Sequence, residues 1–162
     1  MIRLRQSQWV DLVGKPSWSV YWVGRKAKDP LLESARHYEN RISKTQDITV
    51  NILKPSAPEK EASDFMRRLQ PHDYLIALDE HGPLHTTAGW SKHLHHLNDK
   101  NPDRLVFLIG GDDGHHPTLL KQAHETLGLA KFTLPHRLAL VILLEQLYRI
   151  EQVRMGTPYH RR

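Results

Sequence analysis

The sequence predicts an α/β fold, namely an open parallel sheet with helices on both of its faces. Segments typical of strands and of helices alternate strictly along the 162 residues, and this alternation is what produces parallel sheets. The strand segments are short and nearly all apolar, as in YLIAL at 74–78, which suits strands buried on both sides. An apolar share of 39% is sufficient for the core of one domain.

Three strands and two helices are expected in the first half of the chain. Residues 18–24 (WSVYWVG) alternate and are rich in aromatic and β-branched side chains, which is typical of a strand. Apolar side chains at helical spacing predict a helix over 29–41, and the strand 48–53 is ended by prolines. A short helix at 59–69 has an apolar inner face, and 74–78 is the third strand.

The second half of the chain is expected to continue the same alternation. The helix 86–97 presents an apolar stripe, and 105–109 (LVFLI) is the fourth strand. The helix 117–127 begins on a proline, which suits the first helical turn. The apolar segment 129–134 is predicted to be the fifth strand, and the last helix, 135–155, is ended by a glycine.

Residues 1–16 fit none of these elements. They precede the first strand and are interpreted as an N-terminal extension of unknown role, such as a tail, an interaction arm or a misassigned start. The remaining residues, 17–162, are expected to form a single domain.

Charge and composition narrow the class of protein. Twenty-three Lys and Arg against 18 Asp and Glu give a net charge of +5, which favours polyanionic partners, although a merely soluble basic protein has the same balance. The absence of cysteine excludes disulfides and thiolate sites. No apolar run reaches the ~18 residues of a membrane span, and no secretory start is present. We therefore expect a cytoplasmic protein without membrane contact.

Two segments indicate a cofactor pocket. Gly110 and Gly111 follow the fourth strand, at the sheet edge where open α/β folds bind ligands, although a plain tight turn also explains them. Neither a dinucleotide fingerprint nor a phosphate loop is present. The apolar residues 129–134 could enclose an adenine while their backbone binds the base edge, but the apolar pattern alone favours an ordinary buried strand.

The twelve histidines raise the alternative of a metal site. His93 and His96 share a helix face, and His115 and His116 are adjacent, but no third ligand accompanies either pair at a familiar spacing. We interpret them as surface histidines and expect no metal. His136, beside a proline at a helix start, suits capping as well as catalysis.

Several motifs carry a family resemblance. The segments IGGDDG, FTLPHRL, LLEQLYRI and TPYHRR, in this order and spacing, closely resemble the ribosomal large subunit methyltransferase H family, a group of SPOUT-class enzymes. The similarity continues upstream in VGRKAKDPLLESARHYENRI and IALDEHGPL and covers about 17–162. The resemblance implies a C-terminal trefoil knot, a homodimer, S-adenosylmethionine as cofactor, and methylation of N3 of a pseudouridine in a 23S rRNA stem-loop. The partner is expected to be 23S rRNA, either by itself or in the assembled ribosome.

The resemblance also implies the site residues. Matched position by position, the cofactor contacts are Leu78, Gly110, Leu129, Ala130, Lys131, Phe132, Thr133 and Leu134. The catalytic group comprises Arg149, Tyr159, His160 and Arg161, the last three in a tail that reaches the partner subunit's cofactor site. His160 is expected to take the N3 proton and an arginine to stabilise the resulting anion, although a tail that only docks RNA phosphate is the alternative. Glu145 and Arg149 also fit an ordinary helical ion pair.

Two other functions stay open at this point. One is a non-catalytic protein that binds RNA or the ribosome, and the other is a methyltransferase that acts on another RNA such as tRNA. The chain departs from the family pattern in the extension 1–16, in Asp112 and Asp113 after the glycines, and in a shorter basic segment around 54–60. These departures affect the RNA-binding surface more than the cofactor contacts.

Overall fold

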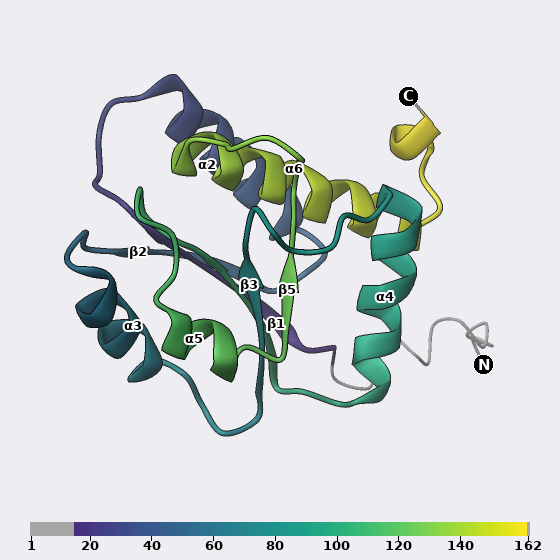
Figure 1. The fold of residues 1–162 in the computed structure, drawn as a ribbon. Helices are drawn as coiled ribbons and strands as arrows, with labels where there is room; N and C mark the ends of the chain where they lie inside the picture. The colour runs from purple at the N-terminus through teal and green to yellow at the C-terminus, as the bar shows by residue number, and fades with distance from the viewer. Residues whose placement is uncertain (1–14, 162) are drawn as a thin grey trace.

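A five-stranded sheet, with all strands parallel, forms the centre of the molecule (Figure 1). The computed structural model describes residues 15–161, and their side chains as far as Tyr159. Across the sheet the strands lie in the order β2 (Ile48–Leu53), β1 (Ser17–Val23), β4 (Arg104–Ile109), β3 (Asp73–Leu78) and β5 (Glu125–Leu127). The predicted open parallel sheet is confirmed.

Helices cover both faces of this sheet. The helices α2 (Pro30–Ile42), α4 (Thr87–Asp99) and α6 (His136–Arg154) pack on one face, and α3 (Pro58–Met66) and α5 (Pro117–Gln122) pack on the other. A short 3₁₀ turn, η1 (Pro158–Arg161), follows α6. The structure therefore has the two covered faces that the apolar strands predict.

The core is divided into two clusters by the sheet. Trp18, Val20 and Trp22 of β1 lie in the cluster beneath α2, α4 and α6. Tyr21 and Val23 lie in the cluster beneath α3 and α5. Successive side chains of a strand point to opposite faces, so an apolar residue is needed at almost every position of β1. This double burial explains why the strands read as continuous apolar runs.

Local signals in the sequence fix several helix ends. Asp29 is the N-cap of α2, and its Oδ1 accepts a hydrogen bond from the Leu31 N–H at 2.7 Å. Thr86 caps α4 in the same way, since its hydroxyl accepts from the Gly89 N–H at 3.0 Å. Gly156, just beyond α6, has a φ of +72°, a conformation that glycine adopts without a Cβ clash. These ends agree with the sequence-based boundaries to within one or two residues.

The prediction for 117–134 is wrong in two respects. The helix predicted over 117–127 ends at Gln122, and its last residues form the edge strand β5 instead. The strand predicted over 129–134 is an irregular loop. Both errors reflect pairing with β3. Its last residues, Ile76–Leu78, pair with Glu125–Leu127, and after an isolated bridge between Leu84 and Gly128 the segment 129–134 has no strand partner in the described chain.

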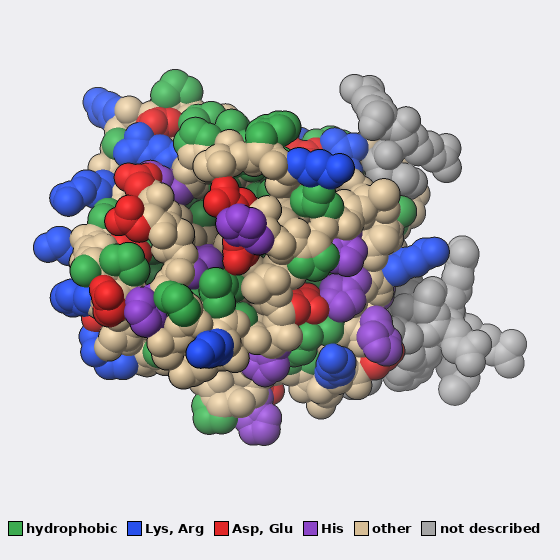
Figure 2. Space-filling model, in the orientation of Figure 1, with side chains coloured by type: hydrophobic (Ala, Val, Ile, Leu, Met, Phe, Trp, Pro, Cys, Tyr) green, Lys and Arg blue, Asp and Glu red, His purple; other side chains and the backbone are tan. Residues whose placement is uncertain are grey.

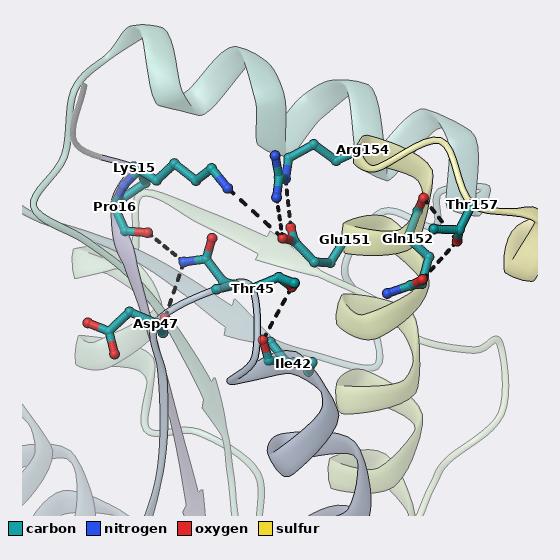
Figure 3. Close-up of polar contacts among 10 residues, drawn as sticks. Lys15, Pro16, Ile42, Thr45, Asp47, Glu151, Gln152, Arg154 and Thr157 are labelled. Atoms are coloured by element: carbon teal, nitrogen blue, oxygen red, sulfur yellow. Dashed lines mark hydrogen bonds and ion pairs between the residues drawn. The ribbon is translucent and has the colours of Figure 1, made fainter. Parts of the chain in front are cut away.

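The start of β1 is tied to the end of α6 (Figure 3). The Gln46 side-chain amide donates to the Pro16 carbonyl at 2.9 Å. The carboxylate of Glu151, which is only 1% exposed, pairs with Arg154 and lies 4.0 Å from the Lys15 ammonium. Of the predicted extension 1–16, residues 1–14 lie outside the described residues. Within the described range, none of the helices is both long enough and apolar enough to cross a membrane.

Candidate cofactor site

A cavity of about 720 Å³ opens at the carboxyl ends of β3 and β4. Its walls include residues 78–81 after β3, residues 109–115 after β4, and residues 129, 130 and 132–136 of the loop and helix start. Two other hollows in the described residues hold only about 10 and 20 Å³, which is space for little more than one water molecule. The large cavity lies where open parallel sheets bind their ligands.

Seven of the eight residues predicted to contact the cofactor line this cavity. They are Leu78, Gly110, Leu129, Ala130, Phe132, Thr133 and Leu134. The eighth, Lys131, is exposed and does not line it. The residues come from three separate segments of the chain and meet only through the sheet, so the structure brings together a set that the sequence keeps up to 56 residues apart. Their roles stay predictions.

The loop 129–134 leaves its backbone available to a ligand. Within the described chain, none of its N–H or carbonyl groups is paired with another backbone group. Leu129 and Leu134 pack against the core, whereas the side chain of Phe132 is 71% exposed. Apolar side chains next to free peptide groups suit a flat aromatic base that has polar atoms along its edge.

His115 is a site residue that sequence reasoning missed. Its Nε2 lies 2.8 Å from the Leu78 carbonyl oxygen, so the ring donates a hydrogen bond to the end of β3. Burial lowers the pKa of His115 below its ordinary value of 6.5, which keeps the ring neutral at physiological pH. Only its place after two glycines at a strand end could have drawn attention to it, and it was interpreted as a surface residue.

The glycines after β4 serve different purposes. The left-handed conformation that favours glycine occurs at Gly114, which has a φ of +70°. Gly110 is needed for space, because a Cβ atom there would lie 3.1 Å from the His115 ring and from the backbone of Gly114. The turn is closed by the Gly114 N–H, which donates to the Gly111 carbonyl at 3.0 Å.

Carboxylates line the mouth of the cavity on two sides. Asp79 and Glu80 follow β3, and Asp112 and Asp113 follow β4. Asp112 pairs with His136, whose Nδ1 is 3.1 Å away and whose ring stacks on Trp22. Figure 2 shows acidic and histidine side chains gathered around the middle of this face. We refer to the four carboxylates as the acidic rim, and they favour a cationic ligand over an anionic one.

The predicted catalytic residues lie elsewhere on the molecule. The Arg149 Nε donates to Glu145 at 3.0 Å, and the Tyr159 ring lies against both Arg149 and Tyr148. Arg149 is ten residues beyond Ala139, the last cavity residue of α6, which is about 15 Å along a helix. His160 and Arg161 belong to η1, and their side chains are not described. The structure therefore does not bring Arg149 or Tyr159 to the cavity of its own chain.

The environment of the tail fixes the protonation of two groups. The hydrogen bond to Glu145 raises the pKa of Arg149, so this side chain stays a cation. Burial, together with a hydrogen bond to Tyr38, raises the pKa of Tyr159 to about 12, so its phenol stays protonated. The pair of Glu145 and Arg149 is thus the helical ion pair considered from the sequence, with an aromatic ring packed on it.

The histidines considered as metal ligands have other contacts. His93 lies 2.8 Å from the carboxylate of Glu125, and the Nδ1 atom of His96 lies 3.5 Å from the carboxylate of Asp99. His116 accepts the Thr118 N–H as the N-cap of α5. Among the residues that the structure describes, no group of three or more possible ligands is close enough to hold a metal ion.

Comparison with known proteins places the chain in a family. The family described as "Predicted SPOUT methyltransferase" matches residues 17–160. The chain is 38% identical to the ribosomal RNA large subunit methyltransferase H of Maridesulfovibrio salexigens, over 86% of this chain and 94% of that protein. It is 46% identical to the same enzyme of Caulobacter sp. K31, over 74% and 77% of the two chains. The match to that of Synechococcus sp. CC9902 is 37% over 86% and 92%.

The range matched by the family, 17–160, spans the strands, the cavity walls and the tail as far as residue 160. The chain therefore belongs to the SPOUT methyltransferases, in the family of the ribosomal RNA large subunit methyltransferase H.

Proposed function

We propose that the protein transfers a methyl group from S-adenosylmethionine to N3 of a pseudouridine in the 23S rRNA of the large ribosomal subunit, in the cytoplasm. The cavity at the ends of β3 and β4 carries this proposal, because it lies in a methyltransferase fold and is lined by seven of the residues expected to bind the cofactor. The names of the relatives support rRNA as the substrate.

The residues of the cavity fit S-adenosylmethionine. Its volume of about 720 Å³ is within the usual range of small-molecule sites, which is roughly 300–1,000 Å³. The loop 129–134 offers unpaired peptide groups beside Leu129 and Leu134, a suitable environment for the adenine. The acidic rim complements the sulfonium and ammonium charges of the cofactor. When bound, the cofactor supplies an electrophilic methyl group.

The chain must position the base and remove a proton from its N3. We assign proton acceptance to His160, whose side-chain type titrates near neutral pH, and stabilisation of the developing anion to Arg149 and Arg161. Tyr159 stays protonated and is suited to donate a hydrogen bond or to position the base, but not to act as a base itself. Most of the rate acceleration then comes from orientation of two bound reactants.

The position of the tail supports a site shared between two subunits. Arg149 and Tyr159 lie beyond the reach of the cavity in their own chain, while Leu138, Val141 and Ile142 of α6 are only partly buried. A homodimer that pairs these α6 surfaces would cover apolar side chains and present each tail to the partner's cavity. The trefoil knot implied by the resemblance stays a prediction.

A methyl-transfer assay tests the proposal. Purified protein and radiolabelled S-adenosylmethionine are incubated with 70S ribosomes, with naked 23S rRNA and with tRNA, all from cells that lack the modification. We expect label in the 70S sample alone, and nucleoside mass analysis should identify N3-methylpseudouridine. Label in tRNA would make tRNA the substrate in place of 23S rRNA. Cofactor binding without methyl transfer to any RNA would indicate a non-catalytic binding protein.

A further inference from the structure

Four exposed cations lie beside the cavity on the same edge of the sheet. Arg25, Lys26 and Lys28 form the connection that follows β1, and Lys54 follows β2. Since β1 and β2 are parallel neighbours, their carboxyl ends place these side chains together. We call Arg25, Lys26, Lys28 and Lys54 the basic ridge. Figure 2 shows Lys and Arg side chains along this side of the molecule, next to the acidic centre.

The basic ridge is held in place at both of its ends. At its start, the Gly24 N–H donates to the Leu53 carbonyl at 2.9 Å, which joins the ends of β1 and β2. At its end, Asp29 pairs with Arg137 of α6 at 2.6 Å while it caps α2. The positions of the cations are therefore set by the frame of the sheet and α6, in contrast to those of a free loop.

The same anchors connect the ridge to the cavity. Arg137 follows His136, which lines the cavity and stacks on Trp22 of β1. On the β4 side, a Cβ atom at Gly111 would lie 3.1 Å from a methyl group of Val23, only two residues before Arg25. Adjacent strands lie about 4.8 Å apart, so the ridge begins about one strand from the cavity wall.

The charges of the ridge are not neutralised within the described chain. None of its four cations makes an ion pair there. Some cations elsewhere are paired with carboxylates, as Arg104 is with Asp73, Arg137 with Asp29 and Arg149 with Glu145. A set of neighbouring like charges without partners attracts an anion with several charges, because each contact releases bound counterions.

The acidic rim sets the path of such an anion. In the strand order, β4 lies between β1 and β3. Asp112 and Asp113, which follow β4, are therefore expected between the ridge after β1 and the pair Asp79 and Glu80 after β3. Phosphates are repelled from the cavity mouth and attracted to the ridge, whereas an uncharged base can pass the rim. A nucleic-acid strand can therefore keep its phosphates on the ridge while one of its bases enters the cavity.

We propose that the basic ridge binds the phosphate backbone of the RNA substrate and that the acidic rim excludes phosphate from the cavity mouth. This inference rests on the proposed function, since it assumes an RNA whose base is methylated in the cavity. It adds a docking surface on the side of β1 and β2, separate from the C-terminal tail, and it defines the direction from which the RNA approaches.

A charge-reversal variant tests the ridge. R25E/K26E/K28E is compared with the control variant K44E/R68E/K92E, in which three exposed cations away from the ridge change by the same total charge. Binding to 70S ribosomes, which contain the proposed 23S rRNA target, is measured by cosedimentation at several salt concentrations, and S-adenosylmethionine binding by calorimetry. We expect the ridge variant to lose at least tenfold in RNA affinity with a shallower salt dependence, while cofactor affinity stays unchanged. The control variant should lose no more than two- to threefold.

The outcomes separate this proposal from the proposed function. An equal loss in both variants, or no loss in the ridge variant, overturns the ridge as the RNA surface. Binding of phosphatidylserine vesicles that the ridge variant loses, with RNA binding intact, assigns the ridge to membranes and also overturns it. RNA binding that depends on the ridge, in a protein that transfers no methyl group, supports the ridge and overturns the proposed catalytic function.

Discussion

The Nε2 atom of His115 lies 2.8 Å from the carbonyl oxygen of Leu78, so a side chain that follows β4 is bonded to the last residue of β3. Both strand ends are walls of the cavity. Because a carbonyl only accepts, the contact requires a proton on Nε2, and the buried ring supplies it in the neutral form. The link between the two strand ends thus depends on the tautomer of the neutral ring, because only a proton on Nε2 reaches the Leu78 carbonyl.

The first prediction concerns the effect of His115 on stability as a function of pH. The pKa of His115 is lowered from 6.5 by burial, so below pH 6.5 the unfolded chain binds more protons at this site than the folded chain. The free energy of unfolding that His115 contributes is therefore lost as the pH falls from 6.5 toward the lower pKa of the folded state. His115→Gln keeps an N–H donor for Leu78 but cannot titrate, so the wild type should lose more stability than the variant between pH 7.5 and pH 5. Urea unfolding at each pH measures this difference, and parallel curves would contradict the prediction.

A second prediction concerns Gly110. The variant Gly110→Val places a branched side chain against the His115 ring and the Gly114 backbone, so the turn must shift. We expect a folded protein, destabilised by about 1–3 kcal/mol, whose affinity for S-adenosylmethionine is at least tenfold lower. Gly114→Ala is the matched control, because a Cβ there meets nothing within 4 Å and only the positive φ is strained. Calorimetry that finds unchanged affinity for Gly110→Val would remove this residue from the site.

Two adjacent residues provide a third prediction. Phe132 lines the cavity and is 71% exposed, whereas Lys131 does not line it. Phe132→Ala should leave the free energy of unfolding within about 0.5 kcal/mol of wild type, because little core is lost, and should weaken cofactor binding several-fold. Lys131→Ala should change neither quantity. If the two variants bind the cofactor equally well, the loop 129–134 does not contact the ligand as proposed.

The tail provides a fourth prediction. Deletion of residues 159–162 should abolish methyl transfer and leave cofactor affinity unchanged, because Tyr159 lies against α6 rather than against the cavity of its own chain. Some stability should be lost with the contact between Tyr159 and Tyr148.

Coexpression then tests whether the site is shared. A heterodimer of the tail-deleted chain and the Gly110→Val chain contains one intact cavity opposite one intact tail, and it should recover part of the activity. If purified heterodimers stay inactive although both parents fold and dimerise, each tail serves its own subunit.

Much of the fold could be predicted because each signal is local. The apolar runs that became β1 to β4, and caps such as Asp29 and Thr86, determine structure through neighbours in the sequence. The edge strand β5 could not be found in this way. It is only three residues long, and it exists because the free edge of β3 pairs with Glu125 through Leu127. A strand that depends on a distant partner leaves no periodic pattern of its own.

The candidate site, too, could be predicted from the sequence only where its signals are local. Gly110 and the loop 129–134 were identified through motifs, and their convergence around one cavity follows from the parallel sheet. The link between His115 and Leu78 joins residues 37 apart and depends on which way a turn directs one ring. The anchoring of the basic ridge by Asp29 and Arg137 spans 108 residues. Neither contact has a signature in the sequence, because both depend on packing that is settled only once the sheet has formed.

The strand order has a consequence for how the chain is made on a ribosome. The first two strands to be synthesised, β1 and β2, are neighbours in the sheet and can pair as soon as they emerge. The third, β3, lies between β4 and β5, both of which are translated after it. At about 5–20 residues per second, the apolar segment of β3 waits roughly 2–6 seconds for its first sheet partner. During that interval the nascent chain exposes an unpaired apolar strand that is prone to aggregate. The growing polypeptide therefore most needs a chaperone between the completion of β3 and that of β4.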